Sequence, residues 1–192
     1  MNRLSDEIKL ELMKYFRFER NYNLICTEGI HNSDVNAFNG DSLVEIEVKI
    51  SKSDFKKEFK PCENKFLNRS TYWKQYKHNN YAKPSEHPSY TIPNRFYFCV
   101  PAKLEEWAFE YLKDKNPKYG LLVYDLERWT GNAHIITKKP AKNLHNVKPE
   151  PGVLLQLGRR AANELITAKE KFIEQRAELE ALKKGILTTE QE

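Results

Sequence analysis

Two acidic side chains and one lysine, spaced for phosphate-ester chemistry, stand out in the first third of the chain. Asp34 lies in the segment SDVNAF, and Glu47 and Lys49 lie in the segment LVEIEVKIS. Residues i and i+2 of a β-strand project from the same face, so Glu47 and Lys49 are neighbours if this segment is a strand. Two carboxylates on adjacent strands suit a hard divalent ion such as Mg²⁺ or Mn²⁺. The pattern therefore predicts a metal-dependent site that hydrolyses phosphodiesters.

Each residue has a role in this prediction. We expect Asp34 and Glu47 to bind the ion, and Lys49 to position the attacking water and to offset the charge that grows on phosphorus. The carbonyl of Val48, which lies between Glu47 and Lys49, is a further candidate ligand. An acid on the first helix is expected to complete the metal shell. The candidates for this last position are Glu11 and, as second choice, Glu7.

The acid-x-Lys triplet is weak evidence by itself, because a surface strand with alternating charges is its ordinary origin. The chain has the same triplet at Glu7-Ile8-Lys9, Asp54-Phe55-Lys56, Glu58-Phe59-Lys60 and Glu63-Asn64-Lys65. Only Glu47-Val48-Lys49 lies in an alternating, β-branched segment that follows another expected strand with an acid at its start. This context favours the catalytic interpretation over the surface strand.

The elements that must position these residues follow from the spacing of apolar side chains. Residues 5 to 19 have helical spacing, and residues 22 to 28, 33 to 38 and 43 to 50 have strand character. The turn sequence Asn39-Gly40-Asp41 predicts a hairpin between the second and third strands. In the third strand the apolar residues are expected to face the core and the charged residues the opposite side.

The rest of the first 150 residues predicts an α/β domain. Residues 53 to 60 suit a short helix capped by Ser53 and stopped by Pro61. A strand at 95 to 100, a helix at 101 to 115 and a strand at 120 to 124 predict parallel pairing through a crossover, and 134 to 137 is a further possible strand. The expected fold class is a central mixed β-sheet flanked by helices, with a basic insert at about 60 to 94.

Basic residues favour a polyanionic partner such as DNA. The formal charge is +5, and residues 52 to 83 have nine Lys or Arg against three acids. An ordinary solvated face is the alternative. The candidate DNA contacts are Lys52, Lys56, Lys57, Arg69, Lys74 and Lys77.

Aromatic residues and histidines have plainer interpretations. Trp73 and Tyr76 are expected to pack a helix onto the sheet, with base stacking as the alternative. The five histidines are scattered without metal-ligand spacing, and we expect them on the surface.

The last part of the chain, residues 151 to 192, predicts a long helix. Apolar residues follow a four-three alternation from Ala161 to Leu182, which is typical of a coiled-coil seam. A homodimer through this helix and docking of the helix along its own domain are both open.

The arrangement of helix, strand, SDVNAF, turn, LVEIEVKIS and short helix resembles the PD-(D/E)XK nuclease superfamily, with Ser33-Asp34 at the place of Pro-Asp. Within it, Asp34-Val35, the strand 44 to 49, Trp73, Tyr76 and the segment 94 to 101 are similar to MmcB-type DNA repair proteins and, less closely, to archaeal-type Holliday junction resolvases. The resemblance covers about residues 5 to 125. It implies a restriction-endonuclease-like sheet, Mg²⁺ or Mn²⁺ dependence and a DNA substrate.

The expected function is therefore a Mg²⁺-dependent DNA endonuclease or repair nuclease. The alternative is a catalytically silent nuclease-fold module that binds DNA or inhibits another protein. Three widely spaced cysteines form no C-x-x-C pair, which excludes a zinc knuckle or redox motif of that type. The chain has no run of 18 apolar residues and no secretory apolar region at its start, so a cytoplasmic protein without a membrane segment is expected.

Overall fold

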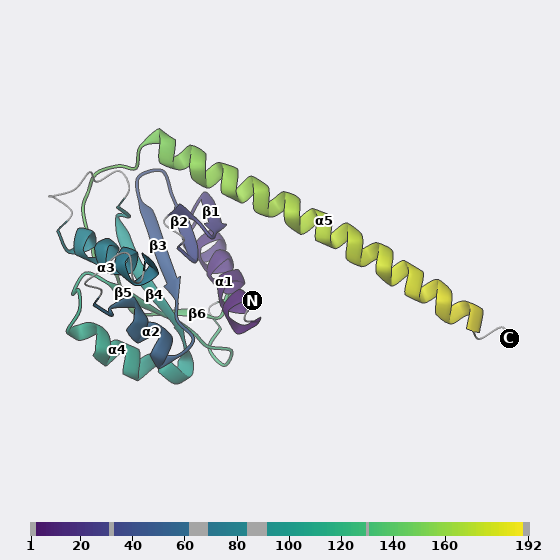
Figure 1. Cartoon of the computed structure of the whole chain (residues 1–192), viewed down its shortest axis with the longest axis horizontal. Coiled ribbons are helices and arrows are strands. Elements are labelled where there is room, and N and C mark those ends of the chain that lie inside the picture. Colours follow the sequence, from purple (N-terminus) through teal and green to yellow (C-terminus); the bar gives the residue numbers. More distant parts are fainter. Residues whose placement is uncertain (1–2, 31–32, 62–68, 84–91, 130, 190–192) are drawn as a thin grey trace.

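The computed structural model describes residues 3–30, 33–61, 69–83, 92–129 and 131–189. Its centre is a six-stranded sheet with the spatial order β1-β2-β3-β4-β5-β6 (Figure 1). The strands are β1 (Leu24–Thr27), β2 (Val35–Phe38), β3 (Leu43–Val48), β4 (Arg95–Pro101), β5 (Gly120–Tyr124) and β6 (Ile135–Lys139). The helices are α1 (Arg3–Lys14), α2 (Lys52–Glu58), α3 (Arg69–Ala82), α4 (Glu105–Lys113) and α5 (Pro151–Thr189), with a π-helical turn η1 (Tyr15–Glu19) after α1 and a 3₁₀ turn η5 (Ala102–Leu104) before α4.

The sheet is mixed. β1, β2 and β3 pair antiparallel, β3, β4 and β5 pair parallel, and β6 pairs antiparallel with β5. The hairpin between β2 and β3 turns at Gly40, whose φ of +92° suits glycine because a side chain disfavours the left-handed region. The predicted α/β class, the hairpin and the parallel crossover from β4 to β5 are confirmed.

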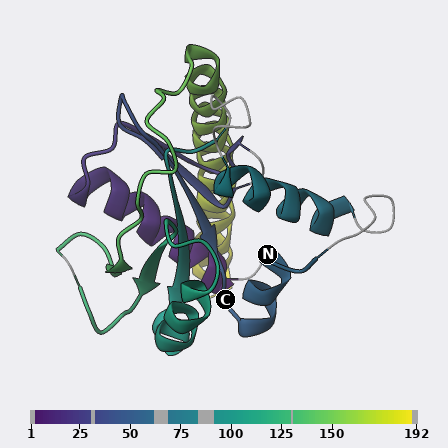
Figure 2. The ribbon, with the colours of Figure 1, turned by 90° about the vertical axis from the view of Figure 1, so that its left-hand side faces the viewer.

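Helices cover both faces of the sheet (Figure 2). On one face α1 and η1 bury Ile8, Leu12 and Phe16 against Val35, Val44 and other strand residues. On the other face Phe55 of α2, Tyr81 of α3 and Leu112 of α4 pack with Phe96, Phe98 and Leu121. β3 is thus enclosed from both sides, and all six of its residues are buried. Its charged side chains consequently lie inside the protein, whereas the sequence pattern alone is typical of a strand with one solvated face.

The cap of α2 differs from the expected one. Ser51, and not Ser53, is the N-cap residue, and its hydroxyl accepts a hydrogen bond from the backbone N–H of Asp54 at 3.1 Å. Ser51 has extended backbone angles, which an N-cap needs, whereas Ser53 already lies inside the helix. The helix therefore begins one residue earlier than predicted.

Helix α5 packs on the domain only near its start. Val153 and Leu157 are buried against Cys26, Phe38 and Leu43, beside β1. The Thr27 hydroxyl donates a hydrogen bond to Glu164 at 2.9 Å, and from there the helix projects away from the sheet (Figure 1). The expected long C-terminal helix is present.

No helix in the described part of the chain combines the length and the apolar character required to cross a membrane.

Candidate functional site

Strand β3 and Lys49, the residue directly after it, send three charged side chains toward the face covered by α2 and α3. Val44, Ile46 and Val48 belong to the core under α1, so the alternation of the strand turns Glu45, Glu47 and Lys49 to the other side. These three side chains are 1%, 6% and 4% exposed. A buried charge is costly unless it is paired and hydrogen-bonded, so partners must surround all three.

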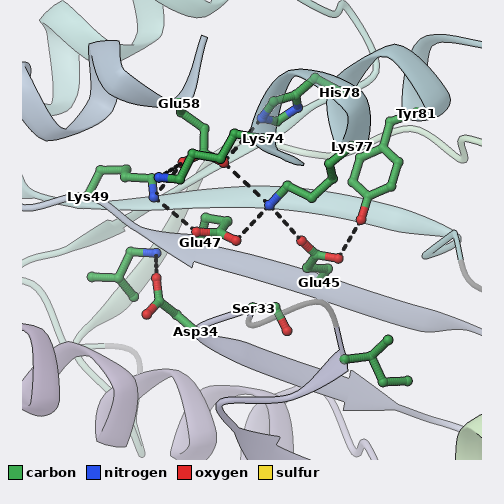
Figure 3. Close-up of polar contacts among 12 residues, drawn as sticks. Ser33, Asp34, Glu45, Glu47, Lys49, Glu58, Lys74, Lys77, His78 and Tyr81 are labelled. Atoms are coloured by element: carbon green, nitrogen blue, oxygen red, sulfur yellow. Dashed lines mark hydrogen bonds and ion pairs between the residues drawn. The ribbon is translucent and has the colours of Figure 1, made fainter. Parts of the chain in front are cut away.

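Lys49 pairs with two carboxylates. Its Nζ lies 2.9 Å from Oε2 of Glu47 and 2.9 Å from Oε2 of Glu58 (Figure 3). Glu58 comes from the last turn of α2 and is fully buried. The sequence prediction did not include Glu58, which appeared only within one of the acid-x-Lys triplets set aside as background.

Lys77, which comes from α3, contacts the same carboxylates. Its Nζ lies 2.7 Å from Oε1 of Glu47, 3.1 Å from Oε1 of Glu45 and 3.4 Å from Oε1 of Glu58. Figure 3 shows this ammonium group among the three carboxylates, at the centre of the cluster. A position that neighbours three carboxylates is one that a cation is expected to fill.

The remaining carboxylate oxygens also have donors. The Tyr81 hydroxyl donates to Oε2 of Glu45 at 2.6 Å, and Lys74 lies 2.8 Å from Oε2 of Glu58. His78 lies between Glu58 and Tyr119. Its Nε2 is 3.3 Å from Oε1 of Glu58, and its Nδ1 is 2.7 Å from the hydroxyl of Tyr119. We call this set the acid–lysine cluster: Glu45, Glu47, Glu58, Lys49, Lys74, Lys77, His78 and Tyr81. With its lysines and carboxylates ionised, three positive charges balance three negative ones.

The pKa directions follow from burial and from these partners. Burial opposes ionisation of Glu58 and Glu47. For Glu58 the hydrogen bond from His78 and the neighbouring lysines outweigh burial and lower the pKa. For Glu47 the charges of Lys77 and Lys49 do the same. For Glu45 burial dominates and raises the pKa. Burial disfavours the charged forms of Lys49 and Lys77 as well, yet the surrounding carboxylates raise the pKa of both ammonium groups. Both lysines are therefore cationic at neutral pH.

His78 is neutral at pH 7 in this setting, because burial lowers its pKa despite the hydrogen bond to Glu58. Its burial contradicts the expectation that all histidines lie on the surface. Trp73 and Tyr76 show the reverse, since they are 51% and 42% exposed instead of packing α3 onto the sheet. α3 turns Lys77, His78 and Tyr81 inward, so the aromatic spacing pointed to the wrong face of this helix.

Asp34 lies just before β2. Val35 pairs with Ile46, which brings Asp34 next to the end of β3. Oδ2 of Asp34 accepts a hydrogen bond from the backbone N–H of Val48 at 2.8 Å, and Oδ1 lies 3.0 Å from Nζ of Lys9. Burial first, and the negative charge of Glu47 second, raise the pKa of Asp34. The two carboxylates thus repel each other, although each has its own lysine partners.

The first helix contributes a lysine and not an acid. Lys9 of α1 reaches Asp34 and also pairs with Glu28. The expected ligand Glu11 instead accepts hydrogen bonds from Lys14 at 2.6 Å and from the backbone N–H of His134 at 2.8 Å. Glu7 pairs with Arg3. The structure therefore bonds Asp34 to the backbone of Val48 and pairs Lys49 with Glu47. It leaves both helix-borne acids with other partners.

The candidate DNA contacts divide into two groups. Lys52, Lys56 and Lys57 are exposed on α2. Lys74 and Lys77 point into the acid–lysine cluster, where they are bound to carboxylates. The side chain of Arg69 lies outside the described residues. Of the described candidates, only the α2 lysines are exposed.

Among the described residues, no three or more His, Cys, Asp or Glu side chains are arranged so that they could hold a metal ion together. The chemistry of Asp34 and Glu47 nevertheless suits a hard ion, since they are neighbouring oxygen donors whose mutual repulsion a cation would relieve. Lys77 and Lys49 occupy the oxygens of Glu47 in this arrangement. A divalent ion at this position would have to compete with Lys77 for Oε1 of Glu47.

No protein-family model matches the chain, and no curated protein sequence matches it. Among solved structures it is similar to "SPO1766 protein of unknown function from Silicibacter pomeroyi", with a TM-score of 0.53 and 13% identity over 87% of this chain and 92% of that chain. At this level of identity the similarity shows a shared fold alone.

Proposed function

We propose that this chain is a metal-dependent DNA nuclease of the PD-(D/E)XK type. The acid–lysine cluster beside Asp34 carries the proposal. Replacing a buried ion pair by apolar side chains of similar volume is often neutral or stabilising, so a fold has little need of so many interior charges. Strongly perturbed pKa values in one cluster are typical of sites that perform chemistry. The polar constellation is best accounted for as a catalytic one.

Asp34 and Glu47 are the residues that would hold the ion, with the Val48 carbonyl as a further ligand. A bound Mg²⁺ or Mn²⁺ supplies Lewis-acid polarisation of the phosphoryl oxygen and lowers the pKa of a bound water. Lys49 keeps its proton because Glu47 and Glu58 raise its pKa. In this proposal its positive charge would orient a water molecule and stabilise the negative charge of the transition state.

Other residues of the chain hold these groups in position. Glu58, at the end of α2, holds the ammonium group of Lys49. The Tyr81 hydroxyl and Lys77 together hold the carboxylate of Glu45. A fixed, largely water-excluded environment strengthens electrostatic interactions within it. The exposed lysines of α2, which follow β3 directly, are suited to bind the phosphates next to the scissile bond. They are Lys52, Lys56 and Lys57.

The second candidate function is a nuclease-fold module that binds DNA or a protein without cleaving it. One observation favours it: all six oxygens of Glu45, Glu47 and Glu58 already have a donor from the chain itself. If Lys77 is a permanent substitute for the ion, the cluster is structural and the metal never enters.

A cleavage assay with matched variants separates the two. We expect Mg²⁺- or Mn²⁺-dependent nicking of plasmid or branched DNA, reduced at least about 100-fold in Lys49→Gln and Asp34→Asn. Lys103→Gln, at an exposed position far along the chain from the site, is the control. Circular dichroism verifies that each variant folds, and fluorescence anisotropy measures DNA binding separately. DNA binding without cleavage under any metal condition supports the second candidate, and equal cleavage by wild type and both site variants contradicts the assignment.

Lys77→Met tests the competition directly. If the ion displaces Lys77, removing the ammonium group strengthens Mn²⁺ binding in calorimetry, and Glu47→Gln abolishes it. If Lys77 is a permanent substitute, neither wild type nor Lys77→Met binds Mn²⁺ above the level of Glu47→Gln. Lys103→Met is the matched control.

A further inference from the structure

The projecting part of α5 exposes a strip of large apolar side chains. From Leu165 onward the helix leaves the domain, and its large apolar residues between 165 and 183 are 52% to 66% exposed. They are Leu165, Ile166, Phe172, Ile173, Leu179 and Leu182. Docking along its own domain ends near Ala161 and Glu164, so the domain does not cover this strip (Figure 1). Exposed apolar surface of this extent marks an interaction site.

The strip has the repeat of a coiled coil. Counting in heptads, the a positions are Leu165, Phe172 and Leu179. The d positions are Ala161, Ala168, Gln175 and Leu182. Ile166 and Ile173 directly follow a positions and widen the strip. All a positions and every d position except Gln175 are apolar. This pattern fits a second helix with the same repeat, so another copy of this helix is a suitable partner.

Charges beside the seam disfavour an antiparallel pair. The e positions after Ala162 are Lys169, Arg176 and Lys183, all basic. In an antiparallel pair e positions face e positions, so this row would meet its own copy in any register. Gln175 would then lie against an apolar a residue of the partner. Both features disfavour that orientation.

A parallel pair has better complementarity. The g positions are Glu164, Lys171 and Glu178, and each faces the e position five residues on in the partner. Glu164 meets Lys169 and Glu178 meets Lys183, which are attractive pairs. Lys171 meets Arg176, but the Arg176 guanidinium already lies 3.1 Å from Glu180 of its own helix, which lessens the repulsion. Gln175 meets Gln175, where two amides can bond each other.

We propose that residues 165 to 182 form a parallel two-stranded coiled coil with the same segment of a second copy. This interface does not depend on the proposed nuclease activity. Pairing covers the strip over a helix length of about 27 Å. The two α/β domains then lie at the same end of the coil.

Sedimentation of the full chain tests the association. The double variant Phe172→Lys/Leu179→Lys places charge in the seam and is expected to raise the dimer dissociation constant at least about 30-fold. The control Asn163→Lys/Ala177→Lys adds the same charge at exposed f positions and is expected to leave the dimer intact. A wild-type chain that sediments as a monomer at about 100 µM, or a control that dissociates as strongly as the seam variant, overturns the proposal.

Crosslinking tests the orientation. In a Cys62→Ser background the remaining cysteines, Cys26 and Cys99, are buried. A parallel pair brings the two copies of residue 182 together, so Leu182→Cys is expected to form a disulfide dimer by itself. An antiparallel pair instead gives a crosslink only when Leu182→Cys is mixed with Leu165→Cys. That second result contradicts the parallel arrangement.

Discussion

At the scale of single residues, Glu58 is a buried carboxylate that depends on several partners for its charge. It is fully buried, and its two oxygens contact Lys49, Lys74, Lys77 and His78. Removing one partner from a buried charge network leaves uncompensated charges, which costs about 3 to 5 kcal/mol. We expect Glu58→Gln to lose roughly that much free energy of unfolding at pH 7, measured by urea titration. Glu110→Gln, which breaks an exposed pair with Lys113, is expected to change it by less than about 0.5 kcal/mol.

The same variant has a defined pH signature. The folded pKa of Glu58 lies below its ordinary value of 4.5, so its ionised form stabilises the protein above that pH. This stabilisation is lost as the pH falls from 4.5 toward the folded pKa. The difference in stability between wild type and Glu58→Gln should therefore shrink on acidification. A difference that stays constant from pH 7 to pH 3 contradicts the pKa direction.

Sequence patterns reached part of the candidate site and missed the rest for a physical reason. Asp34, Glu47 and Lys49 could be placed because they are close in sequence and a strand fixes their geometry. Glu58, Lys77 and Lys9 come from helices, and their approach to β3 depends on tertiary packing. Glu11 looked suitable on helical spacing, but the chain turns it toward His134.

At the scale of elements, the junction between β3 and α2 positions the α2 lysines and Glu58. Ser51 caps the helix two residues after Lys49. Ser51→Ala is expected to lower the free energy of unfolding by about 1 kcal/mol, because the Asp54 N–H loses its side-chain acceptor. The hydroxyl of Ser53 is exposed and contacts the Ser51 hydroxyl, so Ser53→Ala is expected to have less effect. Thermal unfolding of both variants measures the difference, and a larger loss in Ser53→Ala contradicts the cap assignment.

Element types were largely predictable, and element environments were not. Strict alternation in β3 identified the strand and the set of residues on each face. It did not reveal that α2 and α3 bury the charged face, because α3 has no continuous apolar stripe that signals packing. The cap of α2 shifted for a similar reason, since Ser51 and Ser53 are both suitable in composition and the backbone angles decide between them.

At the scale of the whole molecule, α5 packs on the domain near its start and is exposed to solvent from Leu165 to Lys183. Leu157 is 1% exposed beside β1, whereas Leu155 in the same helical turn is 64% exposed. Leu157→Ala is expected to lower the free energy of unfolding by about 2 to 5 kcal/mol, because it opens a cavity. Leu155→Ala is the matched control with an expected change below about 0.5 kcal/mol. Equal effects in chemical denaturation would show that the start of α5 does not pack as described.

Helix α3 is held on the domain by ion pairs more than by apolar contacts. Among the described side chains of residues 72 to 82, His78 and Tyr81 are buried, while Lys74 and Lys77 form ion pairs with acids on β3 and α2. These ion pairs weaken when the carboxylates are protonated, whereas the apolar contacts under α1 and α4 do not depend on protonation. Because the pKa values of Glu47 and Glu58 are lowered, this protonation requires a pH well below 4.5. At such a pH α3 should detach as a local event before the sheet unfolds, and its backbone amides should exchange with deuterium first.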